Sequence, residues 1–179
     1  KVVFVHNYNV SPAEHIIPAA DVSEQISMAG KEASGTSNMK FMMNGALTLG
    51  TLDGANVEIL EAVGDDNAYI FGATEDELPG LRESYDPVWH YENVPGLKRV
   101  LDAFTDGTLD DNGSGWFADL RRSLLEPSYE PADVYYVLGD FASYRETKDA
   151  MAADYADTRA WQRKAWVNIT RSGRFSSDR

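Results

Sequence analysis

Residues 30–41 read GKEASGTSNMKF, and they set a loop of small and hydroxyl-bearing residues directly before a hydrophobic helix. The predicted helix begins near Ser37, so that Lys40 falls in its first turn. The first amides of a helix have no partner within the helix, and they carry a partial positive charge that suits a phosphate group. The stretch therefore predicts a phosphate-binding loop beside a lysine.

The surroundings of Lys40 suggest a chemical role for its amine. Its neighbours in residues 39–43 (MKFMM) predict an apolar patch, which would destabilise the ammonium form and leave a nucleophilic amine. A phosphate-binding loop beside an imine-forming lysine suggests pyridoxal phosphate as cofactor. Spacing alone leaves plainer alternatives open: Lys40 as a lysine on a helix surface, Glu32 as a solvated loop carboxylate, Tyr8 as a core aromatic, and the methionines as core packing.

Strand and helix signals alternate along the first half of the chain, and helical signals dominate the second half. Short apolar runs predict strands at residues 1–5, 47–51 and 68–71. Helices are expected at residues 12–17, 21–27, 37–45, 56–63, 95–105, 115–126, 132–152 and 157–171. This order predicts an α/β fold, in which a parallel sheet carries helices on both faces and a helical C-terminal layer follows. Ligands of such sheets bind beyond the carboxyl ends of the strands.

Composition excludes several classes of function. The net charge of −13 argues against nucleic acid and anionic membranes as partners, and no apolar run approaches the ~20 residues of a membrane span. Cysteine is absent, which excludes disulfides and thiolate chemistry and is compatible with the cytoplasmic location that we expect. His6, His15 and His90 have no metal-ligand spacing, so no metal site is expected. The sequence also lacks the Walker, dinucleotide-binding and nucleophile-elbow motifs.

The sequence further predicts that the chain is a piece of a larger protein. It begins inside an apolar run that is typical of a buried strand, and residues 175–178 are typical of the start of another helix. Residues 1–60 contain Lys1, Lys31 and Lys40 as their only Lys or Arg residues, against six acidic residues. A cofactor phosphate together with a second phosphate needs more cations than these. We therefore expect the missing cations to come from other sequence.

Residues 32–40 (EASGTSNMK) closely resemble the pyridoxal phosphate signature of the alpha-glucan phosphorylases. Other stretches resemble that family in the same order along the chain, namely residues 7–11, 17–21, 44–48, 50–58, 136–141 and 172–179. The resemblance covers nearly the whole chain and is least distinctive at residues 73–130. It implies that residues 1–179 are the later part of the C-terminal, cofactor-carrying domain of a two-domain enzyme of the Rossmann-like glycosyltransferase-B type. The N-terminal domain and the start of this domain would then be absent.

The resemblance also implies a reaction and a set of site residues. The reaction is reversible phosphorolysis, in which phosphate takes the terminal glucose of an alpha-1,4-glucan as glucose 1-phosphate with retention. Lys40 would carry pyridoxal phosphate as an imine, and the cofactor's phosphate group would relay a proton to the substrate phosphate. The other implied contacts are the amides of Thr36 and Ser37 with the cofactor phosphate, Tyr8 along the cofactor, a buried Glu32 carboxylate with the glucose hydroxyls, and the backbone of Ala33, Ser34 and Gly35 with the same sugar.

The parent protein is thus expected to act on alpha-1,4-glucan and phosphate, whereas this chain alone is expected to be inactive. Two alternatives remain open. One is a non-catalytic α/β module that associates with further copies of itself through an exposed sheet edge, and a homo-oligomer is expected. The other is a fragment of a sugar-nucleotide glycosyltransferase of the same architecture, which would need no imine at Lys40.

Overall fold

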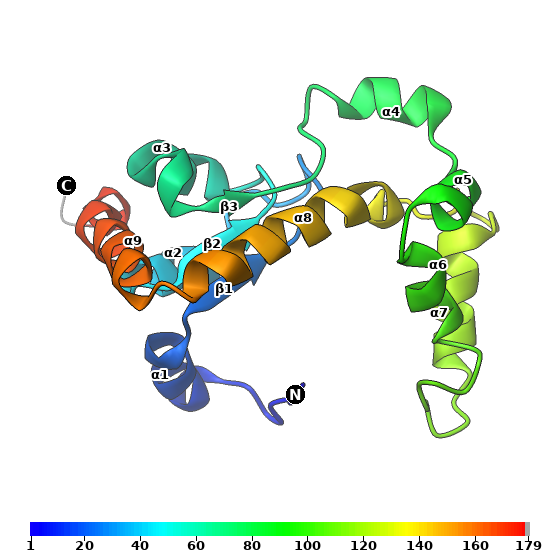
Figure 1. The fold of residues 1–179 in the computed structure, drawn as a ribbon, viewed down its shortest axis with the longest axis horizontal. Coiled ribbons are helices and arrows are strands. Elements are labelled where there is room, and N and C mark those ends of the chain that lie inside the picture. Colours follow the sequence, from blue (N-terminus) through cyan, green and yellow to red (C-terminus); the bar gives the residue numbers. More distant parts are fainter. Residues whose placement is uncertain (178–179) are drawn as a thin grey trace. The chain divides into compact units, whose positions relative to one another are not determined.

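The computed structural model describes residues 1–177, and these divide into two compact units (Figure 1). The first unit comprises residues 1–71 together with the chain from Thr147 onward, and the second comprises residues 72–146. The long helix α8 (Val137–Tyr155) contributes residues to both units. Each unit has a hydrophobic cluster of its own.

A parallel sheet forms the centre of the first unit. Its strands β1 (Val22–Gln25), β2 (Leu47–Gly50) and β3 (Tyr69–Ile70) lie in the order β1-β2-β3. All residues of β2 are buried, so both faces of this central strand are covered. The predicted α/β class is therefore confirmed, and β2 and β3 lie within the apolar runs that predicted them.

Helices surround this sheet and supply the rest of the core. They are α1 (Val10–Ala19), α2 (Ser37–Met43), α3 (Asn56–Val63) and α9 (Thr158–Arg171), with the short 3-10 helices η1 (Asp65–Asn67) and η2 (Ser172–Phe175). The core cluster joins Met42 of α2 to Ile59 and Val63 of α3 and to Ala68 before β3. The helix α9 packs on α2 and α3 and also contacts β2. This packing fixes the position of α2, which carries the predicted cofactor lysine.

The second unit is helical within the residues described. It contains α4 (Leu78–Ser84), α5 (Pro87–Asn93), α6 (Leu97–Asp102), α7 (Trp116–Leu125) and the beginning of α8. Its core is built from Tyr91, Leu97, Leu101, Leu125 and Leu138. The helices predicted at residues 95–105, 115–126 and 132–152 correspond to α6, α7 and α8.

Two predicted elements at the start of the chain are wrong. Residues 1–5, predicted as a buried strand, are irregular and exposed, and the exposed fraction of Phe4 is 81%. These residues pair with none of the described strands, and an apolar run without hydrogen-bonding partners does not form a strand. Residues 21–27, predicted as a helix, contain β1, because pairing with β2 outweighs the local preference of this polar segment.

Both ends of the helix predicted at residues 12–17 differ from the structure. The helix begins earlier, because its N-cap is Asn9, whose side chain accepts a hydrogen bond from the Ser11 amide. Pro18 lies inside the last turn of α1, where only one further residue follows it. Gly173, which follows the helix predicted at residues 157–171, lies within η2. The further helix predicted at residues 175–178 extends beyond the described residues.

Candidate functional site

Residues 30–35 form an irregular loop between β1 and α2. The side chains of Glu32, Ala33 and Ser34 are exposed to solvent. Gly30 and Gly35 adopt φ values of +76° and +83°, which side-chain-bearing residues rarely reach. The course of the loop therefore depends on a glycine at each of its ends.

The turn that follows β2 holds this loop in place. Asp53 is 5% exposed, and its two carboxyl oxygens accept hydrogen bonds from the amides of Gly30 at 2.9 Å and Glu32 at 2.8 Å. The Ala55 amide donates to the Ser34 carbonyl oxygen at 2.6 Å. The backbone of the loop is thus attached at three points to a turn more than twenty residues further along the chain.

A buried polar network connects α2 to the same turn. The Asn38 side-chain amide donates to Asn56 Oδ1 at 3.1 Å, and the Asn56 amide donates to the Thr51 carbonyl oxygen at 3.0 Å. The Thr51 hydroxyl in turn donates to the Ser27 carbonyl oxygen at 2.5 Å. Because both side-chain amides are buried, these bonds fix the first turn of α2 relative to α3.

The amides predicted to hold a phosphate group are available. Within the described chain, the backbone N–H groups of Gly35, Thr36 and Ser37 donate no hydrogen bond. Thr36 instead accepts, through its carbonyl oxygen, from the Lys40 amide at 3.3 Å. Lys40 itself is the fourth residue of the seven in α2, so it lies one turn beyond these free donors.

Lys40 and Tyr8 line the same cavity, although 31 residues separate them in the chain. The cavity has a volume of about 540 Å³ and lies between α1 and the end of α2. Ile17 and Met43 also form part of its wall. The Lys40 amine makes no ion pair or hydrogen bond with any residue that the structure describes. The structure thus brings together a primary amine and an aromatic ring that sequence analysis had associated.

The predicted enclosure of the Lys40 side chain among the apolar side chains of its own helix is wrong. Lys40 is exposed, and Met43 is 45% exposed, whereas Met42 is fully buried. Residues two apart on a helix point about 200° away from each other, so Met42 enters the core while Lys40 faces outward. The interpretation of the methionines as core packing holds for Met42 and fails for Met43.

The environments of Tyr8 and Glu32 also differ from two expectations. Tyr8 is 58% exposed, so the alternative of a core aromatic is wrong. Glu32 is exposed, which contradicts the expected buried carboxylate. Its Oε1 atom accepts a hydrogen bond from the Ser34 amide at 3.4 Å, within its own loop. Both side chains therefore retain polar or aromatic surface that a ligand could contact.

Pyridoxal phosphate needs a primary amine for its aldehyde, donors for its phosphate group and a surface for its ring. The described residues offer the Lys40 amine, the free amides of Thr36 and Ser37 and the ring of Tyr8. The amine, the amides and the aromatic ring thus match the aldehyde, the phosphate group and the ring of the cofactor. Residues 1–71 contribute few positive charges to this unit, because Lys1, Lys31 and Lys40 are their only Lys or Arg residues.

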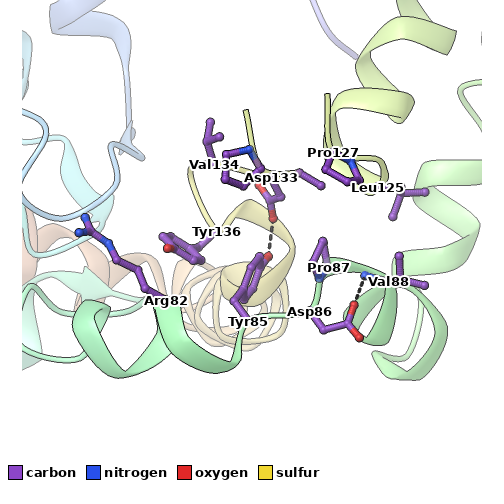
Figure 2. A pocket seen from close by; sticks show the side chains of 12 residues that line it. Arg82, Tyr85, Asp86, Pro87, Val88, Leu125, Pro127, Asp133, Val134 and Tyr136 are labelled. Carbon is purple, nitrogen blue, oxygen red and sulfur yellow. Dashed lines mark hydrogen bonds between the residues drawn. The ribbon is translucent and has the colours of Figure 1, made fainter. Parts of the chain in front are cut away.

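A second cavity, of about 590 Å³, lies within the second unit and contains none of the predicted site residues (Figure 2). The Tyr85 hydroxyl donates a hydrogen bond to the buried Asp133, and burial, followed by this bond, raises the pKa of Tyr85. Asp133 also accepts from the amides of Val137 and Leu138 at the start of α8, and Asp86 accepts from the Val88 amide at the start of α5. The carboxyl groups of this cavity therefore serve as helix caps.

Sequence reasoning missed the residues that organise the loop. Asp53, Asn38 and Asn56 have no part in the site that the sequence predicts. A signal was present, because Asp53-Gly54 follows a predicted strand at its carboxyl end, where ligands of parallel sheets bind. The partners of Asp53 lie 21 and 23 residues away, so spacing could not have identified them.

In residues 1–177, no group of three or more His, Asp or Glu side chains is arranged to hold a metal ion. Among the helices described, none has both the length and the apolar character that crossing a membrane requires.

Comparison with known proteins places this chain in a family. All of residues 1–179 match the sequence profile of the carbohydrate phosphorylases. The chain is 49% identical to glycogen phosphorylase of Bacillus subtilis (strain 168) over 181 aligned residues, and 47% identical to glycogen phosphorylase of Synechocystis over 180. It is 45% identical to the liver form of human glycogen phosphorylase over 180 residues.

The chain belongs to the carbohydrate phosphorylase family. Each of the three alignments covers 100% of this chain but only 21–22% of the relative, so the chain spans about one fifth of the length of these relatives.

Proposed function

We propose that this chain is part of a pyridoxal phosphate-dependent alpha-1,4-glucan phosphorylase, which releases glucose 1-phosphate from the end of a glucan with retention. Three relatives at 45–49% identity are named glycogen phosphorylase. The observation that carries the proposal is the position of Lys40 on one cavity with Tyr8, one turn beyond free loop amides. That arrangement suits a cofactor with an aldehyde, a ring and a phosphate group.

The proposed roles are those that the resemblance implies, and the shared cavity of Lys40 and Tyr8 supports them. Lys40 anchors the cofactor through its amine, Tyr8 lies along the ring, and the amides of Thr36 and Ser37 donate to the phosphate group. Glu32 accepts hydrogen bonds from glucose hydroxyls. Its exposure in this chain suits that role, because an exposed carboxylate has oxygen lone pairs left for a ligand.

The backbone of Ala33, Ser34 and Gly35 completes the proposed sugar contacts. When bound, the cofactor supplies a phosphate group whose second pKa of ~6 suits proton exchange with the substrate phosphate. The residues of this chain bind and orient the cofactor and the sugar. Hydrogen-bond donors and acceptors that match each hydroxyl of the sugar also discriminate against sugars that lack one of these hydroxyls.

We further propose that the chain is the later part of the C-terminal, Rossmann-like domain of its parent, and that it is inactive alone. The scarcity of cations in residues 1–71 supports this, because two phosphate groups would meet there. The substrate phosphate would then be bound by residues of the remaining four fifths of the parent protein.

A phosphorolysis assay tests the proposed function. The intact protein is expected to release glucose 1-phosphate from maltodextrin and phosphate. Glu32→Gln should lower kcat/KM at least about tenfold, because it weakens a charged hydrogen bond to substrate. Glu83→Gln, a change at an exposed glutamate of α4, is the matched control and should leave activity unchanged. Absence of phosphorolysis in the intact protein, or equal effects of the two changes, would contradict the proposal.

One observation favours a second candidate, a self-associating module. The strand β1 lies at an edge of the described sheet, and Val2, Val3 and Phe4 are exposed. An unpaired edge strand and exposed apolar side chains can each contact another copy. Size-exclusion chromatography of the chain should then show a concentration-dependent dimer, whereas a monomer at every concentration would exclude this candidate.

A further inference from the structure

The loop of residues 30–35 presents a physical problem for the function proposed above. It is exposed and contains two glycines with positive φ, and such a segment has many accessible conformations in isolation. A loop that binds sugar through Glu32 must nevertheless hold one position. Contacts with residues outside the loop must therefore fix its conformation.

We infer that Asp53 is a positioning residue for substrate binding, and that the turn of residues 53–55 is the template on which the sugar-binding loop is held. This inference rests on the proposed function of the loop. Asp53 does not itself face a ligand, because it is buried beneath the loop and bonds to the amide of Glu32. It would act through the backbone of the residue that contacts the sugar.

The bonding of Asp53 supports this role. Among the described residues Asp53 forms no ion pair, and the Gly30 and Glu32 amides each bond to one of its two carboxyl oxygens. Hydrogen bonds to a charged acceptor are stronger than neutral ones. An asparagine at this position would present an NH₂ group to one of the two amides, so one bond would be replaced by two opposed donors.

Gly54 shows how closely the turn and the loop approach each other. A Cβ atom at Gly54 would lie 2.5 Å from the Ser34 carbonyl oxygen and 2.9 Å from Glu32 Cγ. Gly54 also has a φ of +51°, and the next residue, Ala55, donates to Ser34. A methyl group at Gly54 would therefore push the loop away while leaving the Asp53 carboxyl group intact.

The intact protein that contains this chain allows a test with two independent variants. Asp53→Asn removes one attachment, and Gly54→Ala displaces the loop by contact. The control is Asp86→Asn, because Asp86 also accepts two amide hydrogen bonds, from Val88 at 2.9 Å and Trp89 at 3.1 Å, but caps α5 in the other unit. Hydrogen exchange is followed in peptides covering residues 28–36, with the α9 peptide reporting whether each variant is folded. Inhibition of phosphorolysis is compared between glucose and a set of monodeoxyglucoses.

Both loop variants are expected to accelerate exchange at Gly30 and Glu32 by about tenfold, with exchange in α9 unchanged. Selectivity for glucose over the deoxyglucoses should fall by about tenfold, and kcat/KM by up to about 100-fold, because a misplaced binding group loses its directed contacts. Asp86→Asn should change neither the exchange of the loop amides nor the sugar selectivity and kcat/KM.

Unchanged loop exchange and unchanged sugar selectivity in a folded, active Asp53→Asn protein would overturn the inference. Faster exchange with unchanged selectivity would also overturn it, because Asp53 would then order the loop without serving substrate binding. If the wild-type protein itself does not carry out phosphorolysis, the proposed function fails. In that case the exchange data still decide separately whether the turn holds the loop.

Discussion

The hydroxyl group of Tyr69 donates a 2.7 Å hydrogen bond to Asp154, which lies 85 residues further along the chain. Lys164 of α9 pairs with the same carboxylate at 3.1 Å. The Tyr69 ring also stacks on Trp161, with a centroid distance of 6.1 Å. Asp154 thus joins β3, α8 and α9, and the Tyr69 hydrogen bond, with Lys164 next, holds the pKa of Asp154 below its ordinary value.

Loss of the Tyr69 hydroxyl should destabilise the first unit. Tyr69→Phe keeps the ring but removes a hydrogen bond to a charged acceptor, so we expect the free energy of unfolding to fall by about 1–2 kcal/mol. Tyr129→Phe removes a hydroxyl from a fully exposed side chain and should change it by less than about 0.5 kcal/mol. Urea denaturation of the two variants and the wild type measures both values. Equal destabilisation by the two changes would show that the Tyr69 hydrogen bond contributes nothing.

Asp140 should make the stability of the second unit depend on pH. Burial raises the pKa of Asp140, although the Ala73 amide, at 2.9 Å, opposes that shift. A carboxyl group whose pKa is raised by folding stabilises the protein while it is protonated, and that contribution is lost as the pH rises through the pKa of the folded state. Wild-type protein should therefore lose stability relative to Asp140→Asn as the pH rises above about 4.

Thermal unfolding between pH 4 and neutrality checks this prediction, with Asp149→Asn at an exposed position of α8 as the control. The midpoint of Asp140→Asn should rise relative to wild type with increasing pH, whereas the control difference should stay constant. A difference for Asp140→Asn that does not change, or that narrows as the pH rises, would contradict the assignment.

Two adjacent methionines of α2 should respond differently to truncation. Met42 is fully buried against Ile59, and Met42→Ala would leave a cavity that costs about 2–5 kcal/mol of unfolding free energy. Met43 is 45% exposed, so Met43→Ala should cost less than about 1 kcal/mol. Denaturant unfolding distinguishes the two. Similar losses for both variants would mean that α2 does not direct these side chains as described.

The contrast between α3 and β1 shows which parts of the fold could be predicted from sequence. The bounds of α3 match the prediction at both ends, because the Asp53-Gly54 turn precedes it and Gly64, with a φ of +78°, ends it. Local signals suffice there. The strand β1 is short and polar, and its conformation comes from pairing with β2, which lies more than twenty residues away.

The candidate site also has one part that could be predicted from sequence and one part that could not. Lys40 and its loop form one contiguous stretch, so sequence analysis could associate them with each other and, by resemblance, with Tyr8. The exposure of Lys40 could not be predicted, because the neighbouring apolar residues do not show which helix face meets the core. The hydrogen bonds that Asp53 accepts from the loop amides depend on the tertiary fold, so they could not be predicted either.

The most direct test of the proposed cofactor site is to locate the cofactor on the chain. The intact protein is reduced with borohydride and digested, and the position of any pyridoxyl group is determined by mass spectrometry, with Lys40→Arg as the comparison. We expect a pyridoxyl group on Lys40, and none on Lys31 or in the Lys40→Arg protein. A pyridoxyl group on another lysine, or an active enzyme that contains no pyridoxal phosphate, would contradict the proposed cofactor site.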